Sequence, residues 1–396
     1  MRLAKKIAVL ICLFIIGYLF TPYPLEAREV GKKATGIADN VDLAEEIDLS
    51  NIRDMLKQLD QDVQESLPDF SLSKTFEDLK KGDFNFSPQV LAENIAKTIV
   101  RQLVVNGPLI VKLLLLAILC AVINQLQLAF SGNVAKIAQM MIYLVLLGIA
   151  ITSFQIALDV GSEAIDNMVS FMQATLPVMY ALLLAMGNLT SAAIFQPMVL
   201  GSLVFLASLI KSIVLPLFFL SIVLRLFNNI SDQFKLAKFS SLLDFAGKFC
   251  IGIVMTVFIG IMAVQGVTGG VADGVALRTA KYSADLIPVV GKYFKDAVEL
   301  VVTSGLVLKS ALGLIALLAI VFITLAPIIK IIAMMFTFKI TAALVEALGE
   351  KKLSDSLQDM SKGLLYIFTA VASVGIMFFM AIAIIIGTGD LALMLR

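Results

Sequence analysis

The residues with the clearest potential for chemistry form one short segment, from Gln265 to Lys281. Glycines four residues apart let two helices approach closely, so we favour a site of helix packing. The alternative is a nonhelical break in the backbone, lined by the charged side chains, that forms part of a pore mouth or a partner site. The segment combines four glycines with three charged residues: Gly266, Gly269, Gly270, Asp273, Gly274, Arg278 and Lys281.

A phosphate-binding loop is the third interpretation of this glycine-rich segment. Such a loop has the pattern GxxxxGK followed by Ser or Thr, and its backbone N–H groups hold the phosphates. The pattern occurs nowhere in the sequence. This chain is therefore not expected to hydrolyse ATP by itself.

Charged residues inside apolar runs are the second group of candidates, because a charge at the centre of a bilayer costs about 2.5 kcal/mol or more. Most of them lie close enough to the end of a run to extend their charge to the lipid headgroups. Lys309 and Lys330 have long apolar flanks on both sides and are the candidates for a pore or intramembrane role. The full set is Lys112, Lys211, Arg225, Lys309, Lys330, Lys339 and Glu346.

Four prolines are candidate helix breaks, namely Pro177, Pro216, Pro288 and Pro327. The first two are 39 residues apart, as are the last two, which predicts an internal repeat of 137–248 and 249–361 at an offset of 111 residues. Chance spacing among the ten prolines of the chain is the alternative. Duplicated halves with proline-broken helices are typical of transporters.

The composition excludes a soluble globular enzyme. Of the 396 residues, 59% are hydrophobic and 15% are charged, whereas soluble domains carry about 25% charged residues. The chain has no histidine, so it has no histidine general base and no histidine metal ligand. Its three cysteines lie in apolar runs, and we expect neither a disulfide nor a metal nor any other cofactor. A net charge of +1 gives no reason to expect nucleic acid as a partner.

The N-terminus has the layout of a secretory signal peptide over residues 1–27, with a basic start, an apolar run and a small residue, Ala27. The alternative is an uncleaved signal anchor. Both place residues 28–107 outside the cytosol. This acidic segment contains a predicted amphipathic helix from Leu49 to Val63, and a second that begins at Pro88 behind Ser87 and ends before Asn106. The apolar stripes of the two helices pack on one another or on the membrane surface, or they dock on a partner.

Residues 108–396 predict a multi-span helical membrane domain. The apolar runs are long and lack the alternation of strands, so the fold class is all-α, a polytopic protein with seven to nine transmembrane helices. Asn124, Gln125 and Gln127 can hydrogen-bond to neighbouring helices. The charge pattern places the polar segments 159–170 and 271–300 outside and 230–248 in the cytosol. The candidate spans are 109–130, 137–158, 171–187, 192–211, 213–229, 249–270, 301–322, 323–341 and 363–387.

The sequence resembles the stage III sporulation protein AE family of endospore-forming bacteria. The resemblance rests on VQGVTGGVADGVALRTAK and LIPVVGKYFKDA between Val264 and Ala297, and on the closing SVGIMFFMAIAIIIGTGDLALMLR. It covers nearly the whole chain, including the order of signal peptide, acidic segment and spans.

The resemblance implies a role in spore formation. Members of the family belong to a channel complex, similar to a secretion system, in the mother-cell membrane around the forespore, and the complex maintains late forespore gene expression. The implied partners are an ATPase, ring-forming subunits and membrane lipid, with residues 28–107 in the intermembrane space. On this basis we expect a nonenzymatic channel subunit. The alternative is a self-sufficient transporter, which the near absence of carboxylates within the spans disfavours.

Overall fold

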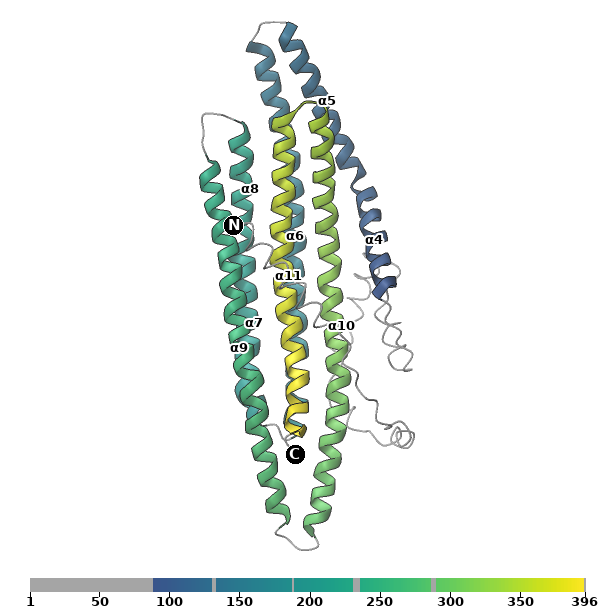
Figure 1. Ribbon diagram of the computed structural model, residues 1–396, viewed down its shortest axis with the longest axis vertical. Coiled ribbons are helices and arrows are strands. Elements are labelled where there is room, and N and C mark those ends of the chain that lie inside the picture. The colour runs from purple at the N-terminus through teal and green to yellow at the C-terminus, as the bar shows by residue number, and fades with distance from the viewer. Residues whose placement is uncertain (1–87, 130–132, 187–188, 231–235, 286–289, 395–396) are drawn as a thin grey trace, which may run out of the picture. The chain divides into compact units, whose positions relative to one another are not determined.

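The computed structural model describes residues 88–129, 133–186, 189–230, 236–285 and 290–394, and side chains over most of these ranges. All of them belong to one compact unit, Leu49–Arg396. The described residues form helices and no strand, which confirms the predicted all-α membrane fold. The helices are α4 (Pro88–Val105), α5 (Gly107–Ala129), α6 (Asn133–Ala185), α7 (Leu189–Leu209), the π-helix η3 (Ile210–Val214), α8 (Leu215–Ile230), α9 (Ala237–Asp285), α10 (Val290–Ala347) and α11 (Lys351–Met394) (Figure 1).

Within the described ranges, six helical stretches are long and apolar enough to cross a membrane, against seven to nine expected for the chain. Three pairs of predicted spans each form one continuous helical stretch, in α6, in α7 through α8, and in α10. The six stretches are Gly107–Gln125, Met140–Ala185, Pro197–Asn229, Ala237–Val264, Leu308–Ala347 and Lys351–Gly387.

The expected external loop at 159–170 is wrong, because these residues lie inside α6. Polar side chains alone do not end a helix when neighbouring helices hold its other face. Asp159, Glu163 and Asp166 share one exposed face of α6, while the opposite face of this turn is buried. Gly161 lies on that buried face, where an added Cβ would stand 3.0 Å from Ile367 of α11.

The proline positions also differ from the prediction. Pro177 and Pro327 lie inside α6 and α10, which continue past them, so the breaks expected there are wrong. Each proline removes one backbone hydrogen bond, and packing against neighbouring helices maintains the rest of the helix. Pro216 follows η3, in which the N–H of Leu215 donates to the carbonyl of Ile210, five residues back. This wider turn accommodates the proline ring. Pro288 lies outside the described residues.

Helix α11 is the centre of the packing, with α6, α8, α9 and α10 all in contact with it (Figure 1). A glycine makes its closest approach possible. A Cβ at Gly363 would stand 2.4 Å from Ile222 of α8 and 2.7 Å from Phe154 of α6. The tight turn from α10 into α11 uses Gly349 at φ +86°, a conformation that favours glycine.

The predicted helix that begins at Pro88 and ends before Asn106 is confirmed as α4. Its apolar residues Ile95 and Ile99 pack on Phe322, Leu325 and Ile329 of α10. The signal peptide and the helix predicted at Leu49–Val63 lie outside the described residues and stay predictions. The internal repeat also stays a prediction. At its offset of 111 residues, the single helix α6 corresponds to the end of α9 and the start of α10.

Candidate functional site

A group of charged residues lies between α8, α9 and α11. We call Arg225, Asp244, Asp359 and Lys362 the charged cluster. Arg225 comes from α8, Asp244 from α9, and Asp359 and Lys362 from α11. Asp244 is buried, with 5% of its side chain exposed, and the Arg225 side chain is 20% exposed. Charges this far from water are retained where they are paired and hydrogen-bonded.

The contacts of the charged cluster pair both carboxylates with cations. One Nη of Arg225 donates to Asp244 Oδ2, and the other lies 3.5 Å from Asp359 Oδ1. Lys362 Nζ donates to Asp359 Oδ1 at 3.0 Å. The Ser221 hydroxyl, one turn before Arg225, lies within hydrogen-bond distance of Asp244 Oδ1 and of the Ser240 carbonyl. The cluster therefore ties three helices together around one arginine.

An aromatic contact extends the charged cluster toward its exposed side. The Tyr366 hydroxyl donates to Asp244 Oδ2 at 3.3 Å, and Lys248 Nζ donates to the Tyr366 oxygen at 3.0 Å. Lys248 also lies 4.2 Å from the centre of the Tyr366 ring, a cation–π contact. The Tyr366 ring also packs on Phe218 of α8, with ring centres 5.0 Å apart.

A second polar layer connects α6 to the same helices. The hydroxyls of Tyr143 and Ser356 lie 2.5 Å apart, and Asn229 Nδ2 donates to Ser356 Oγ at 3.1 Å. The side-chain oxygen of Asn228 accepts from the backbone N–H groups of Leu236 and Ala237, where α9 begins. Asn228 thus caps α9 and fixes the start of the helix that carries Asp244.

A third polar contact joins α5 to the turn between α10 and α11. Glu350 is buried, and its carboxylate accepts from Asn124 Nδ2 and from the thiol of Cys120 at 3.5 Å. Asn124 therefore does form a hydrogen bond within the bundle, but its partner lies in the turn between two helices and not in a neighbouring helix as predicted. Gln125 is exposed instead, and the side chain of Gln127 lies outside the described ones.

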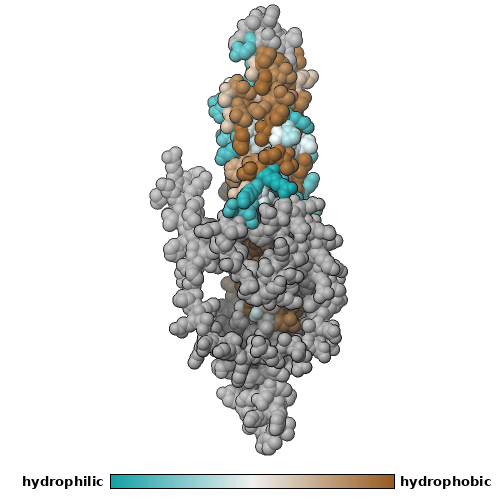
Figure 2. Space-filling model, turned by 90° about the vertical axis from the view of Figure 1, so that its right-hand side faces the viewer, coloured by the Kyte–Doolittle hydropathy of each residue, from teal (hydrophilic) through white to brown (hydrophobic). Residues whose placement is uncertain are grey.

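The outer face of α5 is apolar and open. Figure 2 looks onto the side that carries α4 and α5 and shows an apolar surface above a polar strip. A hollow of about 350 Å³ lies on this face beside Leu348, lined by Ile118, Ala121, Val122 and Gln125. We call the exposed apolar residues of this helix the α5 face: Val111, Leu115, Ile118, Leu119 and Val122.

The glycine-rich segment lies in α9, which is helical as far as Asp285. The alternative of a nonhelical backbone break at this segment is therefore wrong. A helix tolerates these glycines because each costs only about 1 kcal/mol relative to alanine. The side chains of Asp273, Arg278 and Lys281 lie outside the described ones, so helix packing or a partner contact at this segment stays a prediction.

The two candidate lysines have different surroundings. Lys309 is completely buried, and its Nζ donates to the carbonyl of Ile386 in α11 at 2.8 Å. Lys330 is half-buried on α10. A pore role of either lysine stays a prediction.

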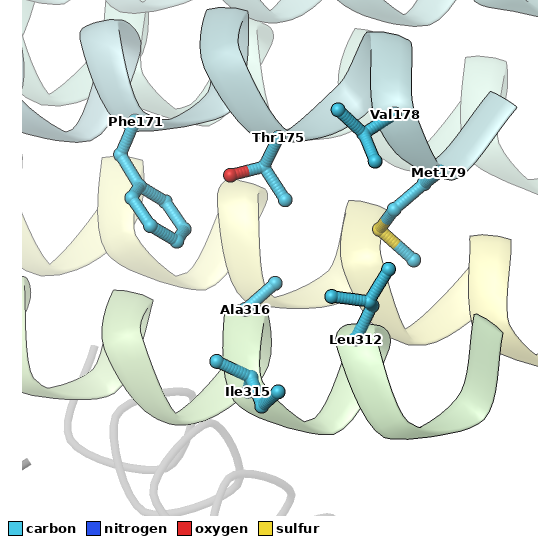
Figure 3. Close-up of a pocket in the computed structure, with 7 residues that line it drawn as sticks. All are labelled: Phe171, Thr175, Val178, Met179, Leu312, Ile315 and Ala316. Carbon is cyan, nitrogen blue, oxygen red and sulfur yellow. The ribbon is translucent and has the colours of Figure 1, made fainter. Parts of the chain in front are cut away.

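A small cavity lies between α6 and α10, near Pro177. Figure 3 shows Phe171, Thr175 and Met179 of α6 facing Leu312 and Ala316 of α10 across it. Its volume is about 10 Å³, enough for a single water molecule. The Thr175 hydroxyl is buried at its edge without a hydrogen-bond partner. A substrate would need a cavity at least ten times larger.

Sequence reasoning missed most of the charged cluster. Arg225 was interpreted as a residue extending to the headgroups, and Asp244, Asp359 and Glu350 were not singled out. One signal was present, since Asp355, Asp359 and Lys362 recur at helical spacing at the start of α11. Spacing alone does not tell which of these side chains faces the neighbouring helices. Asp359 does so, whereas Asp355 is exposed.

These features define a polytopic helical membrane protein whose helices are joined by buried polar contacts. The sequence-family model described as stage III sporulation protein AE matches residues 70–389. The stage III sporulation protein AE of Bacillus subtilis (strain 168) is 34% identical over 317 residues, which cover 80% of this chain and 79% of that protein. The chain belongs to the stage III sporulation protein AE family. No solved structure matches it.

Proposed function

We propose that this chain is a nonenzymatic membrane subunit of the channel complex that connects the mother cell to the forespore. It acts in the mother-cell membrane around the forespore, with residues 28–107 in the intermembrane space. Its partners are an ATPase, ring-forming subunits and membrane lipid. Family membership supports a role in sporulation. The finer channel role is what the resemblance to this family implies.

The observation that carries this proposal is the α5 face. Buried contacts from Asn124 and Cys120 to Glu350 fix α5 on the bundle, yet its outer side chains stay exposed around a hollow. Val111 and Leu115 are 56% and 61% exposed. A fixed apolar helix face with a hollow is suited to a neighbouring subunit, because apolar anchors in pockets supply most of the affinity of an interface.

The second candidate, a self-sufficient transporter, was suggested by proline-broken helices. Transporters bind substrate where helices unwind near the middle of the membrane. The helices at Pro177 and Pro327 are continuous instead. The cavity beside Pro177, at about 10 Å³, is too small for a substrate larger than water. The subunit role is therefore favoured.

The test is purification of the tagged chain from sporulating cells in mild detergent, with mass spectrometry of the proteins that accompany it. We expect the ATPase and ring-forming subunits in one large particle. The double variant Ile118→Ala, Val122→Ala should reduce their recovery about tenfold, equivalent to about 1.4 kcal/mol. The control is Ile213→Ala, Leu220→Ala, a similarly exposed pair outside the α5 face.

A wild-type chain recovered alone after crosslinking would overturn the subunit role. An unchanged particle from the α5 double variant would instead overturn the assignment of the α5 face as the assembly surface.

A further inference from the structure

The apolar stretches of the long helices exceed the thickness of a bilayer. The stretch Met140–Ala185 of α6 has 46 residues, and Leu308–Ala347 of α10 has 40. At about 1.5 Å per residue they are about 69 Å and 60 Å long. The hydrocarbon core is about 30 Å thick, and a tilt of 40° accommodates only about 39 Å. Lipid therefore covers only part of the length of these helices.

Contacts between helices define two levels along the bundle. At the first level, the sulfur of Met168 in α6 lies 3.6 Å from the hydroxyl oxygen of Thr324 in α10, and Thr324 packs against Gly375 of α11. At the second level, Gly305 of α10 lies against Met186 of α6. The α6 segment between these levels, from Met168 to Met186, is about 27 Å long, close to the thickness of a hydrocarbon core.

Between the two levels, the described surface carries no charge. We call this region the uncharged band; it comprises 168–186, 197–210, 254–264, 305–324 and 375–387. Its single charged residue is Lys309, which is completely buried. The described exposed residues of the band are Ser170, Gln173, Ala181, Leu184, Ala185, Pro197, Met198, Gly201, Phe205, Ser208, Thr256, Val257, Ile259, Gly260, Ala263, Val264, Ala311, Leu314, Ile376 and Gly387.

Beyond the first level the surface is different. We call this region the charged half; it comprises α4, α5, 137–167, 211–230, 236–253, 325–347 and 351–374. Exposed charges occur there on α4, α5, α6, α9, α10 and α11. They are Glu93, Lys97, Arg101, Lys112, Asp159, Glu163, Asp166, Lys238, Lys248, Lys339, Glu346, Lys351, Lys352, Asp355 and Lys362.

We infer that the acyl chains of the bilayer surround the uncharged band, and that the charged half stands outside the hydrocarbon. An exposed charge costs about 2.5 kcal/mol or more at the bilayer centre, and the charged half presents many of them. The α4 helix alone exposes Glu93, Lys97 and Arg101 on one face. Within the described surface, the band combines the absence of exposed charge with the thickness of a hydrocarbon core.

This placement changes the topology. Five helices, α6, α7, α9, α10 and α11, then cross the lipid, and α5 does not, although its composition is that of a span. The α5 face lies in an aqueous space, where protein is the cover that its apolar side chains require. The junction between α9 and α10 lies on the opposite side of the membrane from α4 and α5.

The test uses the absence of tryptophan from this sequence, so that a single introduced tryptophan reports one position. Phe205→Trp places it in the uncharged band, at a residue 62% exposed, and Phe245→Trp in the charged half, at one 65% exposed. Each variant is reconstituted into phosphatidylcholine vesicles with bromine atoms on the acyl chains. We expect Phe205→Trp to lose most of its emission relative to unbrominated vesicles, and Phe245→Trp to lose little.

The reverse result would place lipid around the charged half, and equal loss at both positions would mean that lipid covers both regions. Either result overturns the inference. Ile376→Trp and Leu119→Trp provide a second exposed pair, in the band and the charged half respectively, should either first variant fail to fold.

Discussion

The charged half and the uncharged band share close packing at glycines but differ in their buried ionic contacts. In the charged half, Arg225, Asp244 and Asp359 join α8, α9 and α11, and Glu350 joins α5 to the turn between α10 and α11. Glycine packing occurs in both regions, at Gly363 in the charged half and at Gly313 in the band. Contacts of this second kind suit lipid, where small residues bring helices close. Loss of a buried charge should therefore destabilise mainly the charged half, whereas overpacking at a glycine should destabilise either region.

The largest expected effect is the removal of the central charge of the charged cluster. Arg225→Met leaves Asp244 buried without its cation, and breaking a buried pair costs about 3–5 kcal/mol. We expect a correspondingly lower thermal unfolding temperature in detergent. The control is Lys339→Met, which removes an exposed charge and should change little. An unfolding temperature equal to that of the wild type would mean that the cluster does not hold the helices together.

The next effect concerns packing at α11. Gly363→Ala forces a Cβ against Ile222 and Phe154, and overpacking costs about 1–3 kcal/mol. The matched control is Gly148→Ala in α6, where an added Cβ meets nothing within 4 Å. That control should gain up to about 1 kcal/mol from helix propensity. Thermal unfolding of both variants checks this, and equal responses would show that the close approach at Gly363 is not required.

A smaller effect is expected where α5 joins the bundle. Asn124→Leu removes a hydrogen bond from the buried carboxylate of Glu350, at a cost of about 1–2 kcal/mol. Amide hydrogen exchange in α5 should become faster, because this contact holds the helix. The neighbouring substitution Gln125→Leu, at an exposed position, serves as the control. Unchanged exchange in α5 would mean that Asn124 contributes nothing to its attachment.

The smallest effect lies within the uncharged band. Thr175→Val removes a buried hydroxyl without a partner, and the variant should be equally stable or more stable by up to about 1 kcal/mol. Thr337→Val is the matched control, since its hydroxyl donates to the carbonyl of Ala333 at 2.9 Å and its loss should destabilise. Chemical unfolding compares the two. Clear destabilisation by Thr175→Val would indicate a partner, such as a bound water in the small cavity.

The sequence predicts helices better than it predicts where they end. Ser87-Pro88 and Asn106-Gly107 delimit α4 because capping and proline signals are local. The sequence predicts two spans and a loop where the structure has the continuous helix α6, since the acidic residues Asp159, Glu163 and Asp166 are typical of a loop. Their exposure on one face of α6 is determined by which other face packs on α11, and this is tertiary information.

The candidate site was predictable only in part. A local pattern identified Asn124 as a polar residue in an apolar helix, and the structure gives it a partner 226 residues away. The partners of Arg225 come from α9 and α11, so spacing within α8 gave no indication of them. Lys309 was singled out from its apolar flanks, but its bond to the Ile386 carbonyl needed the packed structure.

The most direct test of the difference between the two regions is whether α5 crosses the membrane. Asn106→Cys and Ser131→Cys flank this helix, and each is placed in a chain whose Cys12, Cys120 and Cys250 are replaced by serine. A membrane-impermeant maleimide is applied to one side of sealed vesicles and then to the other. Labelling of both cysteines from the same side is the predicted result. Labelling from opposite sides would mean that α5 spans the bilayer and that lipid surrounds the charged half.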